Sequence, residues 1–144
     1  MTIMEAINTV DGLKHNTYSY CEKVQWLSRL EFIIKRQIID THEGWEDVVF
    51  NGYNDRTDKN TVLLVPAPYD EMYIRWLEAQ IDYSNGEYNR YNNSMAMYQT
   101  AYNGYSNYYN RNNMPLGKAL NYFGAVSTSN TPSKVIIDVG IEEV

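Results

Sequence analysis

The chain has 144 residues, with 12 basic and 18 acidic side chains and a net charge of −6. This length suits a single domain with one core. Recognition of duplex DNA needs clustered lysine and arginine, so an acidic chain argues against that class of function. No run of about 18 apolar residues is present, and we expect no segment that spans a membrane. The single cysteine, Cys21, permits no internal disulfide and indicates a reducing compartment.

Two amphipathic helices are predicted at the start of the chain. Thr2 and Glu5 have the spacing of a capping box, and Ser19 and Glu22 repeat it at the start of the second helix. Gly44 marks the expected end of that second helix. Apolar side chains recur at helical spacing in both: Ile3, Ile7, Val10 and Leu13 in the first, and Val24, Leu27, Leu30, Ile34 and Ile38 in the second.

The helical period stops in residues 45–66. Residues 48–50 and 61–65 are two short β-prone runs, and the polar stretch 51–60 joins them. This pattern predicts either a short β-hairpin or an extended loop.

The most regular pattern is a ladder of large, mostly aromatic side chains at alternating spacings of three and four residues. Its members are Ile74, Leu77, Ile81, Ser84, Tyr88, Tyr91, Met95, Tyr98, Tyr102, Tyr105 and Tyr109. This spacing predicts a long helical face. No charged side chain occurs from Tyr91 to Asn110. We therefore expect a helix that packs against other protein, because tyrosine offers a large contact area with few rotatable bonds.

Asn85-Gly86 is a strong turn signal inside this ladder, and Ser84 with Glu87 could cap a new helix. The ladder nevertheless keeps its phase across the pair. We therefore favour a kink or a brief interruption at this point, and we expect Pro115 to end the helix.

Three interpretations of the tyrosines stay open. They could pack only in the core of one chain, or they could combine that packing with an oligomer interface. They could also form an aromatic platform for sugars or single-stranded nucleic acid, although stacking on bases normally comes with a positively charged groove. The candidate interface residues are Tyr88, Tyr91, Tyr98, Tyr102, Tyr105 and Tyr109.

The end of the chain reads differently from the helical part. Residues 128–133 have the composition of a linker, and residues 135–139 are β-prone. We therefore divide the chain into a helical domain at 1–123 and an extended C-terminal arm at 124–144. A lone strand can add to the edge of a sheet in another chain. The candidate residues for such strand addition are Val135, Ile136, Ile137 and Val139.

No pattern indicates a catalytic, cofactor-binding or metal-binding site, and we expect no enzyme. His42-Glu43 lacks a second histidine at the spacing of a zinc site, so we expect a polar helix end there. Asp55 and Asp58 lack the glycine and glutamate of a calcium loop, so we expect a solvated loop. Cys21 is expected to be a small buried residue. Ordinary helix-surface charge is expected for Glu71, Glu78, Asp82 and Glu87.

Several stretches together resemble a known family of small proteins. They are TIMEAI at 2–7, WLS at 26–28, IDTHE at 39–43, LLVPAPYDEMY at 63–73, AQIDYSNGE at 79–87, RYNNS at 90–94 and YYNRNNMP at 108–115. The chain resembles the head–tail connector (adaptor or head-completion) proteins encoded in the structural gene clusters of tailed bacteriophages and prophages. The resemblance covers residues 2 to about 115.

The resemblance implies a structural role in the virion. It implies a small helical bundle with a projecting loop and an extended arm, of which about twelve copies form a ring. Such a ring would lie between the capsid portal and the next neck or tail protein and would extend the DNA channel without recognising sequence. The protein would be made in the host cytoplasm and end in the virion neck. The alternatives are another neck or tail-completion protein, a tyrosine-rich module that binds glycans or host surfaces, and a small DNA-associated regulatory protein.

Overall fold

The computed structural model of the protein describes residues 1–116, and this part is mainly helical, as predicted. It contains four α-helices, α1–α4, and no β-strand among the described residues. The chain forms two compact units. The first holds residues 1–38 and 49–109, and the second holds residues 39–48 and, in the described part, 110–116. The predicted C-terminal arm at 124–144, with Val135, Ile136, Ile137 and Val139, lies outside the described residues.

The first two helices begin where the sequence predicts. Helix α1 spans Ile3–Leu13 and helix α2 spans Tyr20–Ile34. Both predicted capping boxes are confirmed. Thr2 accepts a hydrogen bond from the Glu5 N–H at 3.1 Å, while the Glu5 carboxylate accepts one from the Thr2 N–H at 2.9 Å. Each cap of this kind stabilises its helix by about 1 kcal/mol.

The end of α2 departs from the prediction. A π-helical turn at Lys35–Ile39 follows α2, so helical structure ends ahead of Gly44. Gly44 takes a left-handed conformation with φ of +87° and leads into a short 3₁₀ turn at Trp45–Asp47. Cys21 is exposed, contrary to the expected burial, because the buried part of α2 starts only at Lys23.

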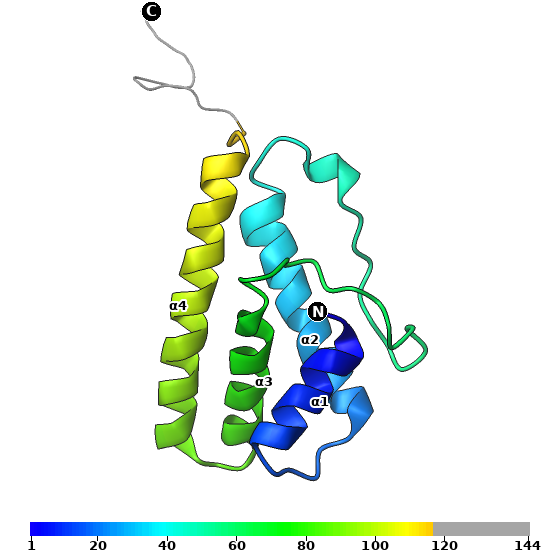
Figure 1. The fold of residues 1–144 in the computed structure, drawn as a ribbon, viewed down its shortest axis with the longest axis vertical. Helices are drawn as coiled ribbons and strands as arrows, with labels where there is room; N and C mark the ends of the chain where they lie inside the picture. Colours follow the sequence, from blue (N-terminus) through cyan, green and yellow to red (C-terminus); the bar gives the residue numbers. More distant parts are fainter. Residues whose placement is uncertain (117–144) are drawn as a thin grey trace, which may run out of the picture. The chain divides into compact units, whose positions relative to one another are not determined.

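Helices α3 (Glu71–Ser84) and α4 (Tyr88–Asn112) lie side by side and run in opposite directions (Figure 1). The interruption predicted at Asn85-Gly86 is therefore present, but it is a full reversal rather than a kink. Gly86 has φ of +76°, a left-handed conformation that glycine adopts without strain. The Gly86 N–H donates to the Tyr83 carbonyl at 3.0 Å and the Glu87 N–H donates to the Asp82 carbonyl at 2.9 Å. This is the Schellman pattern that ends a helix.

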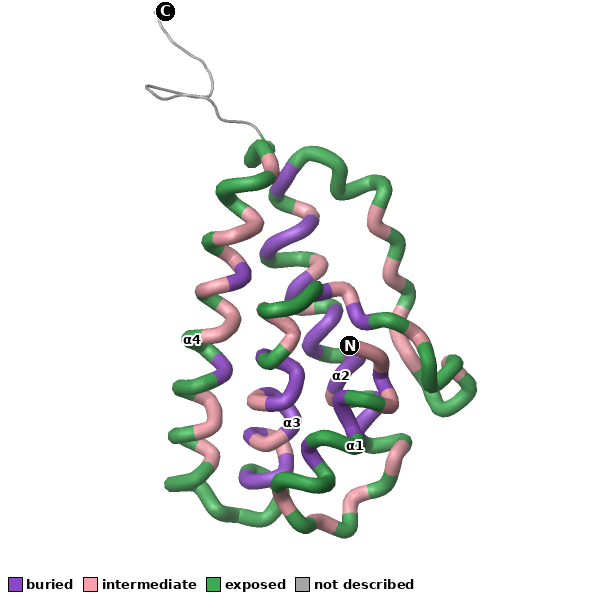
Figure 2. Tube along the Cα trace, in the orientation of Figure 1, coloured by how far each residue is buried: buried purple, intermediate pink, exposed green. Residues whose placement is uncertain are grey.

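The apolar core lies between α1, α2 and α3, which approach one another closely in every pairing. Figure 2 shows many buried positions on these three helices and few on α4. Fully or nearly fully buried side chains fill this core, among them Ile3, Ile7, Val10, Val24, Leu27, Leu30, Ile34, Met72, Leu77 and Ile81. Helix α4 contributes only Tyr98 and Tyr105 to the buried residues of the described chain.

Residues 48–70 form an extended loop rather than a hairpin. Two features attach this loop to the start of α1. The Ile3 N–H donates to the Thr61 carbonyl at 3.1 Å, and an isolated antiparallel bridge pairs Thr2 with Val62. Gly52 has φ of +97°, a left-handed conformation that favours glycine, and a Cβ atom there would also approach the Phe32 ring within 3.3 Å.

A buried carboxylate also fastens this loop. Glu31 of α2 is fully buried and accepts hydrogen bonds from the Tyr53 hydroxyl at 2.8 Å, the Leu64 N–H at 2.9 Å and the Tyr73 hydroxyl at 2.5 Å. The Tyr73 hydroxyl in turn accepts from the Val65 N–H at 2.9 Å. Glu31 thus joins α2, α3 and the loop through one side chain.

Burial raises the pKa of the Glu31 carboxyl, and the three hydrogen bonds offset this only in part. The Glu31 carboxyl group therefore binds its proton more tightly in the folded chain than in the unfolded chain. It follows that the contribution of Glu31 to the free energy of unfolding falls as pH rises from the ordinary carboxyl range through the raised pKa.

We predict that the stability of the Glu31→Gln variant, which cannot ionise at this position, rises relative to that of the native protein as pH increases through this interval. Between the two pKa values the difference in free energy of unfolding should grow by about 1.4 kcal/mol per pH unit. Urea unfolding of both proteins at several pH values from about 4 to 8 measures this difference. A difference that stays constant over the whole interval would contradict the raised pKa.

Candidate functional site

The six candidate interface tyrosines differ in how far they are buried. Tyr98 and Tyr105 are buried within this chain, Tyr91, Tyr102 and Tyr109 are half-buried, and Tyr88 is exposed. Burial raises the pKa of the Tyr98 and Tyr105 hydroxyls above the ordinary value. Tyr98 and Tyr105 therefore act in the core of the single chain, and only the less buried tyrosines have surface to offer a partner.

Ring contacts hold α4 against α3 along its length. The Trp76 ring lies 5.1 Å from the Tyr98 ring, and near the turn the Tyr83 ring lies 5.2 Å from the Tyr91 ring. Just before α3, the Tyr69 ring lies 4.8 Å from the Tyr108 ring and 5.9 Å from the Tyr105 ring. Aromatic pairs of this kind each contribute about 1 kcal/mol beyond their buried area. The tyrosine face of α4 is thus turned toward the chain itself.

The opposite side of α4 is its exposed, uncharged surface, here named the outer face. It comprises Asn92, Asn93, Ala96, Met97, Gln99, Thr100, Asn103 and Asn107. Only Tyr98 and Tyr105 are buried among the 25 residues of this helix. An exposed helix normally covers its outer side with charged residues. A long outer face without charge costs less to remove from water than a charged one.

A groove of about 360 Å³ adjoins the outer face where α4 meets the start of α3. It is lined by Pro68, Tyr69, Glu71, Arg75, Met97, Thr100, Ala101 and Gly104. The Arg75 guanidinium donates to the Glu71 carboxylate at 2.9 Å and to the Glu78 carboxylate at 3.1 Å. Met97 is about half exposed, with 48% of its surface accessible. The groove is therefore apolar with a charged rim.

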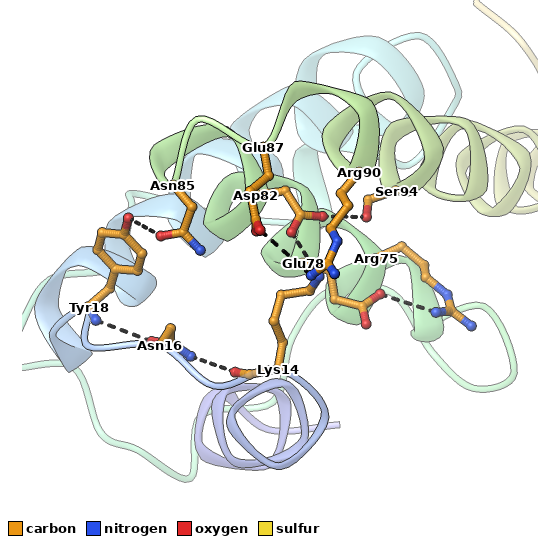
Figure 3. Close-up of polar contacts among 10 residues, drawn as sticks. All are labelled: Lys14, Asn16, Tyr18, Arg75, Glu78, Asp82, Asn85, Glu87, Arg90 and Ser94. Atoms are coloured by element: carbon orange, nitrogen blue, oxygen red, sulfur yellow. Dashed lines mark hydrogen bonds and ion pairs between the residues drawn. The ribbon is translucent and has the colours of Figure 1, made fainter.

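Asp82 corrects the expectation of ordinary surface charge. It is fully buried in α3, and its carboxylate accepts from the Lys14 ammonium at 2.7 Å and from the Ser94 hydroxyl at 2.9 Å (Figure 3). Tyr18 donates to the Asn85 side chain at 2.6 Å in the same region. Lys14 closely follows α1 and Ser94 belongs to α4, so this ion pair ties three helices together. Asp82 therefore helps to position α4.

The remaining sequence candidates show no ligand geometry. His42 is buried rather than a polar helix end, with its Nε2 atom 2.6 Å from the Asn110 side-chain oxygen and its Nδ1 atom 3.0 Å from the Thr41 hydroxyl. Asp55 and Asp58 are exposed, as expected for a solvated loop. Within residues 1–116, no cluster of histidine, cysteine and acidic side chains could hold a metal ion. No helix in the same range is long and apolar enough to cross a membrane.

The structure turns most of the tyrosine side of α4 toward the chain itself and leaves the outer face exposed. The regular spacing of the tyrosines predicts a packed helical face, and this packing is within the chain for Tyr98 and Tyr105. The signal for the outer face was the absence of charge from Tyr91 to Asn110. No protein-family model, curated protein or solved structure matches the chain.

Proposed function

We propose that the protein is a structural subunit of a ring at the head–tail junction of a tailed bacteriophage. About twelve copies would encircle the DNA channel between the portal and the next neck or tail protein. The resemblance in residues 2–115 supplies the connector role. The observation that supports self-assembly is the uncharged outer face of α4 with its adjoining groove.

The chemistry of this surface suits contact with a second copy. A stable interface needs about 800 Å² from each partner, and a helix of 25 residues is about 37 Å long, enough to supply much of that area. Asparagine, glutamine and threonine side chains can form hydrogen bonds across a contact without the desolvation cost of charges. When two different surfaces of the same chain meet, the contact repeats head to tail and can close into a ring.

The net charge of −6 fits the same proposal. DNA binds protein tightly when basic side chains release counterions from the phosphates. An acidic wall offers no such gain, so DNA could pass through the ring without sticking to it.

We predict that Thr100→Lys abolishes ring formation on the portal while leaving the fold intact. Thr100 is exposed and lines the groove, so the lysine is tolerated in the free chain. In the assembled ring it would be an unpaired charge removed from water, which costs several kcal/mol. The measurement is the number of copies that co-sediment with the portal ring from the same gene cluster.

Asn8→Lys is the matched control, because Asn8 is an exposed, uncharged helix residue on α1 and lies outside both α4 and the groove. This variant should load onto the portal as the native protein does. Equal loading of Thr100→Lys and native protein would refute the assembly surface, provided that the native protein binds the portal.

A further inference from the structure

The turn between α3 and α4 can open at little cost in hydrogen bonds. In the closed turn, the last carbonyl groups of α3 and the first N–H groups of α4 have no partners within their own helix. The Gly86 and Glu87 N–H groups use the Tyr83 and Asp82 carbonyls instead. If residues 85–87 became helical, α3 and α4 would form one helix in which all of these groups are paired. The main penalty is a glycine in a helix interior, about 1 kcal/mol.

The sequence pattern is compatible with the straightened form. The ladder from Ile74 to Tyr109 keeps its helical phase across Asn85-Gly86. A continuous helix would therefore place the core-facing residues of α3 and the tyrosines of α4 on one side. The closed hairpin and the straight helix satisfy the same periodicity.

Helix α4 is attached to its own chain mainly through ring contacts and side-chain hydrogen bonds, and only a small part of it is buried. Two of its 25 residues are buried, whereas α1, α2 and α3 share the apolar core. Its polar attachments include the bond from Ser94 to Asp82 and a bond of 2.6 Å from the Tyr102 hydroxyl to the Gln37 side chain. Such an element can leave one chain and bind the same site on another without loss of these contacts.

We propose that α4 is exchanged between copies during assembly. The turn at 85–87 straightens, and the tyrosine face of α4 from each copy lies on α3 of the other, so that two copies form a reciprocal pair. The tyrosine face of α4 and the facing side of α3 are complementary, because they already pack against each other within one chain. The Trp76–Tyr98 and Tyr69–Tyr108 ring contacts re-form between chains. The proposal requires only that two copies meet, and it does not depend on the ring or on the portal.

The conformation of Gly86 gives a direct test. A Cβ atom at this position would meet nothing within 4 Å, so Gly86→Ala changes only the backbone preference. Alanine disfavours the left-handed turn and favours the continuous helix, and we expect a shift of about tenfold or more toward the exchanged oligomer. Gly44→Ala is the matched control, because Gly44 also has a positive φ and no neighbour within 4 Å but lies away from the turn. The measurement is the molar mass in solution by light scattering.

Cross-linking shows which chain supplies α4. Tyr69→Cys and Tyr108→Cys are placed on separate copies, each in a Cys21→Ser background, and the mixed copies are assembled and treated with a short thiol cross-linker. In the closed chain the Tyr69 and Tyr108 rings are 4.8 Å apart, whereas in a straight helix they lie about 60 Å apart. Exchange predicts cross-links between copies. A chain that carries both cysteines and links only to itself, in assemblies of native size, would overturn the proposal.

The outcomes separate the two proposals. Rings with only intrachain cross-links would leave the connector role standing and refute the exchange. Cross-links between copies without portal binding would support the exchange and refute the connector role. If Gly86→Ala does not fold, insertion of two glycines after Gly86 provides the converse test, since a longer turn should reduce the cross-links between copies of otherwise native chain. Unchanged cross-links in that variant would also refute the exchange.

Discussion

Tyr73→Phe is expected to lower the free energy of unfolding by about 3 kcal/mol, although it removes a single oxygen atom. That oxygen is fully buried, donates to the Glu31 carboxylate and accepts from the Val65 N–H. Its removal takes a donor from a buried charge and an acceptor from a buried N–H group, and each loss costs about 1–3 kcal/mol. Urea unfolding followed by circular dichroism gives the measurement.

Tyr53→Phe is the matched comparison, because Tyr53 also donates to Glu31. Tyr53 is only half-buried, so water can replace part of the lost bond, and we expect a loss of about 1 kcal/mol. Equal losses in the two variants would contradict the assigned role of Tyr73 as the link between Glu31 and the loop at Val65.

Lys14→Met is expected to cost about 3–5 kcal/mol, the largest loss that we predict for a single charge. The variant would leave the Asp82 carboxylate, which is 0% exposed, with only the Ser94 hydroxyl from this cluster. A buried charge without its counter-ion is strongly destabilising. The measurement is again the free energy of unfolding from urea titration at neutral pH.

Lys23→Met tests the reason for that cost. Lys23 is the more buried lysine and pairs with Asp11 at 2.7 Å, but the Asp11 side chain is 42% exposed. Water can solvate the carboxylate that remains, so after this screening we expect a loss of about 1 kcal/mol or less. A larger loss from Lys23→Met than from Lys14→Met would mean that burial of the lysine, and not of the remaining carboxylate, decides the cost.

Local patterns predicted the parts of the fold that local physics controls. The capping boxes at Thr2 and Ser19 and the apolar faces of α1 and α2 follow from residues three or four positions apart. The turn at Asn85-Gly86 was also visible. Its direction was not, because the ladder has the same phase in a straight helix and in a hairpin. The left-handed conformation of Gly86 and the contacts between α3 and α4 distinguish the two.

The features missed in the sequence depend on partners that are distant along the chain. Asp82 resembles any surface carboxylate until Lys14 and Ser94 approach it from other helices. Glu31 likewise gains its three donors from the loop and from α3. The side of α4 that remains free is decided by which side the tyrosines occupy, and this too follows only from tertiary packing.

The central claim is that this chain forms a ring on the portal. Negative-stain electron microscopy of the protein mixed with the portal ring from the same gene cluster tests it most directly. The proposal predicts a second ring stacked coaxially on the portal, and its loss with Thr100→Lys but not with Asn8→Lys. Bare portal rings in the presence of excess folded native protein would contradict it.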